Sequence, residues 1–353
     1  MMPYLTEEYG NAGTLYSKGR HAFEAIERAR AQVARYINAE PDQIIFTSGG
    51  SEANSLVVKG VFDTMVKRDV STYVSSVFEH DSLLNAMDDV AVHYGIHHDL
   101  MYPAETVFED PPGGRAGLVS CMMVNNETGD HFYVYDICKA AHKRGALFHT
   151  DAVQCYGDPI DVEAIGCDFL SLSSHKIHGP KGVGALYARN RALLRPLIDG
   201  GMVQEFGLRG GTENVAGIVG FGEACERMQE VDPNELEFLA SIFFGELGTA
   251  LGSEMRWRLN VNSETFGKIL NLRIDNIDAE TLVLAMDSRG VCISAGSACT
   301  SHESNPSHVL TALGLTDDQA RSSVRISFSR MNTEEEAREA AHIMAECVKA
   351  LSA

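Results

Sequence analysis

Two residues of this sequence lie in settings that suit a nucleophile. Cys299 lies in residues 293–306, ISAGSACTSHESNP, whose Ser, Gly, Asn and Pro content predicts an exposed loop. Free cysteines are usually buried, so a thiol in such a loop raises the question of its function. Lys176 follows an apolar stretch and a histidine and precedes a Gly/Pro turn. A lysine held there can be partly desolvated and made nucleophilic, whereas a solvated surface charge is the alternative.

Further polar candidates stand at the ends of predicted strands. These strands cover residues 44–47, 72–77, 118–124, 146–149 and 168–173. Gly50 and Ser51 follow the first of these strands, His80 follows the second and Asn126 follows the third. Asp151 and Gln154 follow the fourth strand, and Ser173 and His175 lie at or just after the end of the fifth. The Gly-rich turn of the first pair could bind an anion at the start of the next helix. For each candidate taken alone, a tight turn, a helix cap or a structural histidine is the alternative.

The elements that carry these residues alternate between strands and helices. Apolar residues at helical spacing predict a helix over 19–37, and residues 133–144 form another that Gly145 ends. Residues 184–188 add a further strand. This alternation predicts an α/β fold whose large domain has a mostly parallel sheet covered by helices on both faces. Such sheets bind ligands at the carboxyl ends of their strands, where the candidates lie.

The sequence changes character after about residue 235. Strand-like stretches at 268–274 and 322–329 flank the Cys299 loop, and a capping box, Thr333-x-x-Glu336, introduces a final helix. We interpret this part as a smaller α+β C-terminal domain. The predicted organisation is therefore a large cofactor-binding domain over 12–235, and a small domain made of 1–11 and 236–353 that carries the loop at 293–306.

Composition excludes several classes of protein. The 353 residues carry a net charge of -20 without a basic patch, so we expect no direct contact with nucleic acid. We find no signal peptide and no membrane span, and eight cysteines without a CxxC motif predict neither a disulfide framework nor a zinc site. These features favour the cytoplasm and predict no bound metal.

Two groups of residues are interpreted as structural. The histidines of HYGIHH are expected at a solvated surface rather than around a metal: His93, His97 and His98. The remaining cysteines are expected to be inert core residues: Cys121, Cys138, Cys155, Cys167, Cys225, Cys292 and Cys347.

The candidates at the strand ends suit one cofactor, pyridoxal 5'-phosphate. This cofactor needs a lysine for its Schiff base, an aspartate for the pyridinium nitrogen and a turn that binds phosphate. Lys176, Asp151 and the turn at Gly50 supply these three groups.

The sequence also resembles the cysteine desulfurases, which belong to the class V aminotransferase-like group of fold-type I pyridoxal-phosphate enzymes. The length of the Cys299 loop and its ACTS sequence resemble the long-loop NifS/IscS-like subgroup. The matching stretches cover the chain nearly from end to end and occur in the same order as in the family. The stretches that carry it are EEYGNAG, IIFTSGGSEAN, EHDSLL, VNNETG, HTDAVQ, DFLSLSSHKIHGPKGVGALY, GGTENVAGIVGFGEA, SAGSACTS, PSHVLTALGL and SSVRISFSR.

The resemblance implies a role for each candidate. Lys176 would form the Schiff base, His80 would stack on the cofactor ring and move protons, and Cys299 would be the nucleophile. The other cofactor-binding residues would be Gly50, Ser51, Asn126, Asp151, Gln154, Ser173 and His175. Arg325, with Asn126, would bind the substrate carboxylate. Thr212 would reach the phosphate of the other subunit, so the resemblance implies a homodimer.

The implied reaction converts L-cysteine to L-alanine and leaves the sulfur on Cys299 as a persulfide, which then passes to a sulfur-acceptor protein. Iron–sulfur assembly, tRNA thiolation and DNA phosphorothioation remain open as destinations. The alternatives are a selenocysteine lyase, another pyridoxal-phosphate enzyme of this scaffold, or a weakly active sulfur-relay or scaffold subunit.

The sequence departs from the family pattern in four places. The strand and turn that usually precede EEYGNAG are replaced by MMPYL, so we expect lower activity than in a relative that has them. Met202 and Val203 replace glycines, which puts close backbone packing there in doubt. Residues 130–132, DHF, differ from the usual Val/Ile-Gln pair, and residues 103–117 are short. The last two changes are expected to affect the periphery.

Overall fold

The chain forms two compact units in the computed structural model, which describes residues 1–102, 115–201, 203–252, 256–260, 268–296 and 306–352. The first unit comprises Met1–Val124 and Phe132–Glu230, and the second comprises Asn125–His131 and Val231–Ala353. Residues 1–11 thus lie in the first unit, which differs from their expected grouping with the C-terminal residues. The short segment Asn125–His131 lies in the second unit, which the sequence did not indicate.

The first unit is built around a seven-stranded sheet, whose order is β1-β7-β6-β5-β4-β2-β3. Its strands are β1 (Ile44–Thr47), β2 (Thr72–Ser76), β3 (His97–Met101), β4 (Ala116–Ser120), β5 (Leu147–Asp151), β6 (Phe169–Ser173) and β7 (Gly184–Ala188). The pairs from β3 to β6 are parallel, and β7 pairs antiparallel with both β6 and β1. The predicted α/β fold with a mostly parallel sheet is confirmed.

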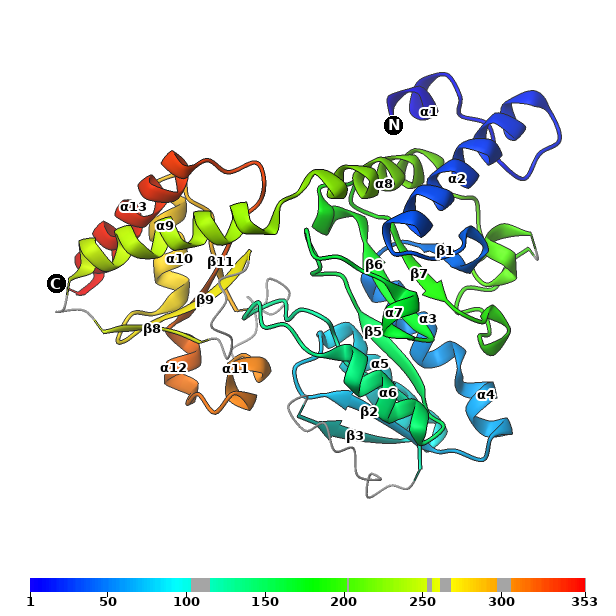
Figure 1. Ribbon diagram of the computed structural model, residues 1–353, viewed down its shortest axis with the longest axis horizontal. Helices are drawn as coiled ribbons and strands as arrows, with labels where there is room; N and C mark the ends of the chain where they lie inside the picture. The colour runs from blue at the N-terminus through cyan, green and yellow to red at the C-terminus, as the bar shows by residue number, and fades with distance from the viewer. Residues whose placement is uncertain (103–114, 202, 253–255, 261–267, 297–305, 353) are drawn as a thin grey trace. The chain divides into compact units, whose positions relative to one another are not determined.

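Helices lie on both faces of this sheet (Figure 1). The α-helices of the first unit are α1 (Met2–Thr6), α2 (Ser17–Tyr36), α3 (Gly50–Gly60), α4 (Phe62–Lys67), α5 (Asp81–Tyr94), α6 (Val134–Lys143), α7 (Val162–Ile165) and α8 (Val215–Arg227). Short 3₁₀ turns occupy Pro41–Gln43, Ser174–Ile177, Arg191–Leu193, Gln204–Gly207 and Met228–Glu230. Helix α3 packs on β5, β6 and β7, and α6 packs on β4 and β5.

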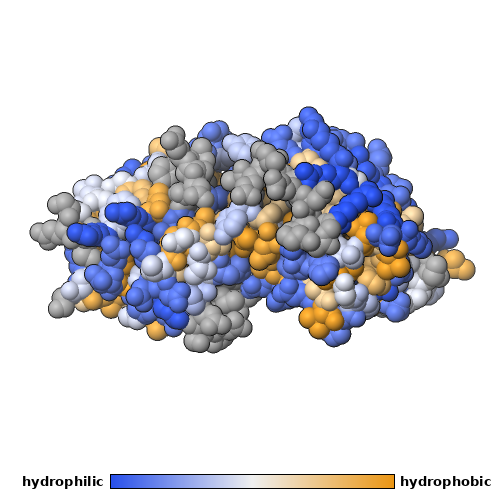
Figure 2. Space-filling view, turned by 90° about the horizontal axis from the view of Figure 1, so that it is seen from below, coloured by the Kyte–Doolittle hydropathy of each residue, from blue (hydrophilic) through white to orange (hydrophobic). Residues whose placement is uncertain are grey.

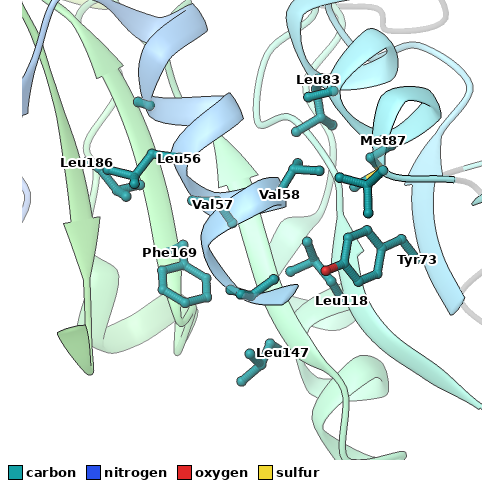
Figure 3. Packing of buried hydrophobic residues seen from close by; sticks show 14 of the residues in the cluster. Leu56, Val57, Val58, Tyr73, Leu83, Met87, Leu118, Leu147, Phe169 and Leu186 are labelled. Atoms are coloured by element: carbon teal, nitrogen blue, oxygen red, sulfur yellow. The ribbon is translucent and has the colours of Figure 1, made fainter. Parts of the chain in front are cut away.

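A hydrophobic core of the first unit lies between the sheet and the helices α3 and α5. Leu56 of α3 lies beside Leu186 of β7, and Tyr73 of β2 lies near Leu118 and Met87 (Figure 3). All five side chains are at most 1% exposed. Burial of aliphatic and aromatic side chains on this scale supplies most of the free energy that holds a helix against a sheet.

A glycine of β7 allows the α3 turn to approach the sheet. A Cβ atom at Gly184 would lie 2.5 Å from the carbonyl oxygen of Leu172 and 2.7 Å from Cα of Gly49. Both contacts are with backbone, which cannot move aside. The glycine at position 184 therefore lets the start of α3 lie directly on the end of the sheet.

The second unit contains a four-stranded antiparallel sheet of order β10-β11-β9-β8. Its elements are α9 (Pro233–Leu251), β8 (Trp257–Leu259), β9 (Ile269–Ile274), α10 (Ala279–Asp287), β10 (Ser294–Ala295), α11 (His308–Ala312), α12 (Asp317–Arg321), β11 (Ser323–Ser327) and α13 (Glu334–Ser352). Helix α13 packs against α9 and α10. Thr333 and Glu336 exchange side chain to backbone hydrogen bonds of 3.2 and 3.0 Å at the start of α13, which confirms the capping box.

Two local predictions are wrong. Cys292, expected in the core, is exposed. His98, expected at a solvated surface, is largely buried, because its Nδ1 lies 2.7 Å from Asp88 and its Nε2 lies 2.9 Å from Oγ of Ser75.

The surface intermixes hydrophilic and hydrophobic residues over short distances on the face that Figure 2 shows. Among the helices that the structure describes, none is long and apolar enough to cross a membrane.

Helix α5 offers a matched test of the core. Val90 is fully buried, whereas Val92 on the same helix is 80% exposed. We expect Val90→Ala to lower the free energy of unfolding by about 2 kcal/mol, because it removes buried methyl groups and leaves a cavity. Val92→Ala should leave stability unchanged or raise it by a few tenths of a kcal/mol, because alanine favours helix. Urea unfolding measures both, and equal losses would contradict the assigned burial.

Candidate active site

The sheet face under α3 and α5 changes from apolar to polar toward the carboxyl ends of its strands. Alternate residues of a strand point to the same face, so Leu147 in the core is followed on that face by His149 and Asp151. On β6, Phe169 in the core is followed in the same way by Ser171 and Ser173. The candidate residues therefore emerge on the side of the sheet where α3 and α5 begin.

His149 forms a buried polar layer below this edge. Its Nδ1 lies 2.7 Å from Oγ of Ser120 and its Nε2 lies 3.0 Å from Oγ of Ser171, so one imidazole joins three neighbouring strands. Burial lowers the pKa of His149 to about 3, so the ring is neutral at physiological pH. The layer fixes the register of β5 next to Asp151.

Asp151 is a buried carboxylate with a hydrogen-bond donor on each oxygen. Its side chain is 5% exposed, Oδ1 accepts from the backbone N–H of Val153 at 2.9 Å, and Oδ2 accepts from Nδ2 of Asn54 at 2.8 Å. Two donors hold the carboxylate plane in place. A buried carboxylate held in this way is suited to bind a cationic N–H group.

Asn54 and Ser82 connect Asp151 to His80. Nδ2 of Asn54 also donates to Oγ of Ser82 at 3.0 Å, and that oxygen lies 2.8 Å from Nδ1 of His80. His80 is the N-cap residue of α5, where its Nδ1 accepts from the backbone N–H of Ser82 at 3.0 Å. Sequence reasoning missed Asn54 and Ser82. The available signal was a polar residue at position 54 among the apolar residues of the buried α3 face.

Lys176 lies in the 3₁₀ turn directly after β6 and is half-buried. Three residues before it, at the end of β6, Oγ of Ser173 lies 3.0 Å from Nδ1 of the exposed His175. Partial burial, and then the charges of Lys176 and Lys181, lower the pKa of His175. Because β5 and β6 are parallel neighbours, with Asp151 paired to Ser171, the turn with Lys176 follows the strand next to Asp151.

The start of α3 supplies free backbone N–H groups. The helix has 11 residues and begins at Gly50, where a Cβ atom would lie only 2.6 Å from Cγ2 of Val153. Ser51 in its first turn is exposed. The free N–H groups and dipole of a helix N-terminus favour an anion such as phosphate. The carboxylate of Glu52, also in this turn, is held by the backbone N–H of Ser48 at 2.8 Å and by Nε of Arg209 at 3.1 Å.

Gln154 is buried just after β5, and Thr212 is exposed in the segment before α8. That segment is anchored by a buried ion pair in which both Nη atoms of Arg30 lie 2.8 Å from the Glu205 carboxylate. Burial alone would lower the pKa of Arg30, but the hydrogen bonds and charge of Glu205 outweigh it and raise the pKa.

The turn before Arg209 that contains Glu205 has an unusual backbone conformation. Glu205 and Phe206 adopt left-handed backbone conformations, with φ of 42° and 60°. Such strain persists where surrounding contacts hold it, and here the buried carboxylate also accepts from the backbone N–H of Phe46 at 2.6 Å. Val203 is exposed, and Met202 lies outside the described residues.

Asn126 and Arg325 lie in the second unit and contact each other there. Nη1 of Arg325 donates to the carbonyl oxygen of Asn126 at 2.8 Å. Oδ1 of Asn126 is buried and accepts no hydrogen bond from the residues that the structure describes. Cys299 lies outside the described residues. The loop that leads to it starts after β10, where Ser294 pairs with Arg325.

The first unit contains a buried acid, Glu79, that was not identified from the sequence. Its Oε1 accepts from Oγ of Ser76 at 2.7 Å and from the backbone N–H of Met122 at 2.7 Å. Complete burial raises the pKa of Glu79 to about 8; the Ser76 hydroxyl opposes the shift, the nearby charge of Asp151 adds to it, and the Met122 N–H opposes it. Glu79 is therefore largely protonated at neutral pH.

The residues of the first unit fit pyridoxal 5'-phosphate. Asp151 offers an oriented carboxylate for a pyridinium nitrogen, Lys176 offers an amine at the end of the next strand, and the start of α3 offers N–H groups for a phosphate. Among the residues of the first unit that the structure describes, no cluster of His, Cys, Asp and Glu side chains could hold a metal ion.

Comparison with known proteins identifies the family. Residues 1–339 match the aminotransferase class-V family. A cysteine desulfurase of Nostoc sp. is 34% identical to this chain, in a match that covers 100% of this chain and 89% of that protein. The chain belongs to the cysteine desulfurases of the aminotransferase class-V family. The sequence-based family assignment is confirmed, and the protein is an enzyme that removes sulfur from cysteine.

Solved structures of similar proteins agree with this membership. A NifS-like protein has a TM-score of 0.87 and 31% identity, with 99% of this chain and 94% of that chain covered. A structure described as SspA in complex with cysteine has a TM-score of 0.77 and 32% identity, with 92% of each chain covered. A cysteine desulfurase fold therefore extends over nearly the whole of this chain.

The pKa of Glu79 predicts a pH dependence of stability. In the unfolded chain its carboxyl ionises near pH 4.5, but in the folded protein it stays protonated to about pH 8. The folded state thus holds one more proton between these values, so its stability falls as pH rises through this window. Relative to Glu79→Gln, the wild type should lose about 1.4 kcal/mol of unfolding free energy per pH unit from about pH 5 to 8. Urea unfolding at several pH values tests this, and a difference independent of pH would contradict it.

Proposed function

We propose that this cysteine desulfurase converts L-cysteine to L-alanine and receives the sulfur on Cys299 as a persulfide. The observation that carries the proposal is the oriented carboxylate of Asp151, joined through Asn54 and Ser82 to His80, beside the strand that leads to Lys176. L-Cysteine as the substrate is supported by the similar protein whose structure is described as a complex with cysteine.

Residues of the first unit would hold pyridoxal 5'-phosphate. Asp151 would bind the ring nitrogen, Gln154 the phenolic oxygen, His80 the ring face, and Lys176 would attach the cofactor covalently. The phosphate would be bound by Gly50, Ser51, Ser173 and His175, and by Thr212 of the other subunit. Among the residues of the second unit, we propose that Asn126 also contacts the cofactor. When bound, the cofactor supplies an electron sink that makes the Cα proton of an amino acid acidic.

The side chains around the substrate would bind it and move its protons. Arg325 would bind the substrate carboxylate with its two-pronged guanidinium, and Asn126 would help to position it. The Lys176 amine, once released from the cofactor, would take the Cα proton. His80 would deliver protons from Nε2, the nitrogen that is not engaged by Ser82.

Cys299 would carry out the sulfur transfer. Its thiolate Sγ forms a bond to the substrate sulfur, the Cβ–S bond of the substrate breaks, and protonation at Cβ gives alanine. One thiol and one cysteine thus become one persulfide and one alanine, so no external oxidant is needed. The pairing of Ser294 with Arg325 supports this role, because the Cys299 loop begins beside the residue proposed to bind the substrate.

We propose a homodimer in which Thr212 completes the phosphate site of the partner subunit. Two observations support it. Thr212 is exposed on its own subunit, and several large hydrophobic residues near the N-terminus of the first unit are also exposed, among them Leu5, Tyr9 and Leu15. A group of large apolar side chains exposed in one region commonly marks a surface that another chain covers.

The sulfur would pass from Cys299 to an acceptor protein, in the service of iron–sulfur assembly, tRNA thiolation or DNA phosphorothioation. The net charge of -20 favours a protein intermediary over direct contact with nucleic acid. We propose the cytoplasm as the compartment, because a reducing environment keeps the Cys299 thiol free.

A cysteine pair tests the nucleophile. Cys299→Ala should lower alanine formation from L-cysteine at least about a hundredfold, because the step that receives sulfur is lost while cofactor binding is kept. Cys292→Ala, at an exposed thiol seven residues away, should keep wild-type activity. Alanine is quantified by mass spectrometry with excess reductant. Full activity in Cys299→Ala would refute the role of Cys299.

A lysine pair tests the cofactor site. Wild-type protein that is incubated with pyridoxal 5'-phosphate and reduced with borohydride should carry the cofactor on the peptide containing Lys176. Lys181→Ala, at an exposed lysine in the same segment, should behave as wild type, whereas Lys176→Ala should carry none. Peptide mass spectrometry reads out each variant. Labelling of another lysine in the wild type would contradict the assignment.

A further inference from the structure

We propose that Asn54 and Ser82 are positioning residues that couple Asp151 to His80 and fix the His80 ring as the neutral tautomer protonated at Nε2. The inference rests on the proposed function only for the identity of the cofactor that Asp151 and His80 would contact. The coupling itself is built from contacts within the first unit.

The orientation of the Asn54 amide follows from its neighbours. Both hydrogens of Nδ2 are used, one on Oδ2 of Asp151 at 2.8 Å and one on Oγ of Ser82 at 3.0 Å. The reversed amide would direct its carbonyl oxygen at the Asp151 carboxylate, and two acceptors cannot share a hydrogen bond. Asn54 is 1% exposed, and its Oδ1 accepts no hydrogen bond from the described residues. The amide is thus held for its two donors, although its buried acceptor is unsatisfied.

The direction of the hydrogen bonds fixes the His80 tautomer. A backbone N–H can only donate, so Nδ1 of His80 must carry a lone pair to accept from the N–H of Ser82 at 3.0 Å. Oγ of Ser82 receives one hydrogen from Asn54, so its own hydrogen is free to point along the 2.8 Å contact to Nδ1. Two donors on Nδ1 leave the ring proton of neutral His80 on Nε2.

One amide therefore orients both groups. The Oδ2 atom of Asp151 and, through Ser82, the Nδ1 atom of His80 depend on the same Asn54 side chain. Removal of this amide should release the Asp151 carboxylate from one of its two donors and weaken the preference of His80 for Nε2–H. A purely packing role for Asn54 would change stability and leave the tautomer alone.

The test measures the tautomer in the full chain without cofactor. Histidine labelled with ¹⁵N reports the protonation of each ring nitrogen by NMR at about pH 8.5, two units above the ordinary histidine pKa, where an imidazole is neutral. His80→Gln assigns the signals. The wild type should show Nε2–H at His80, and both Asn54→Ala and Ser82→Ala should lower the ratio of Nε2–H to Nδ1–H about fivefold, which is the effect of one hydrogen bond.

Ser55→Ala, at the next position of α3, is the matched control and should leave the tautomer unchanged. Ser82 is only half-buried at the start of α5, so Ser82→Ala keeps the test decisive if Asn54→Ala does not fold. A wild-type His80 with its proton on Nδ1, or a tautomer ratio that neither variant changes, would overturn the coupling.

A second readout separates this inference from the proposed function. Titration with pyridoxal 5'-phosphate, followed by visible absorbance, should show about tenfold weaker binding for Asn54→Ala than for the wild type and Ser55→Ala. If the tautomer responds but no variant binds the cofactor, the coupling holds and the proposed function fails. If all variants bind the cofactor equally and the tautomer is unmoved, the proposed function holds and the coupling fails.

Discussion

The first unit depends on how it buries the carboxylate of Asp151. A carboxylate at 5% exposure is stable only where donors satisfy it, and here the backbone after β5 and the side chain of Asn54 provide one donor each. This requirement ties α3 to the carboxyl end of the sheet. The apolar residues of α3 pack on the same sheet face farther down, so hydrophobic burial and polar satisfaction position the helix together.

The sequence predicted those parts of the site that are local. Asp151, Ser173 and Lys176 were found because each lies at or just after an apolar strand, and parallel strands bring their carboxyl ends to one edge. Asn54 and Ser82 were missed because their roles depend on contacts across 97 and 28 residues of sequence. Glu79 was missed for the same reason, since its partner Met122 is 43 residues away. Such contacts follow from the packing of α3 and α5 on the sheet, which a pattern of residue types does not encode.

The second unit shows a further limit of sequence patterns. Asn126 follows β4 in the chain, but its segment lies in the second unit, where Oε2 of Glu127 accepts from Oγ of Ser307 at 2.6 Å and Nδ2 of Asn271 donates to the carbonyl oxygen of Glu127 at 3.2 Å. Gly129 makes this packing possible, because a Cβ atom there would lie 2.4 Å from the carbonyl oxygen of Ile269 and its φ is +79°. The strand pattern predicted a turn at this point and could not indicate which part of the chain the turn would pack against.

The central claim is that the carboxyl edge under α3 binds pyridoxal 5'-phosphate through Asp151 and Lys176. A crystal structure of the protein with this cofactor tests it most directly. We predict a covalent link to Nζ of Lys176, the ring nitrogen within hydrogen-bond distance of the Asp151 carboxylate, and Asn54 still donating to Oδ2. Cofactor bound elsewhere, or bound at this edge without contact to Asp151, would contradict the account.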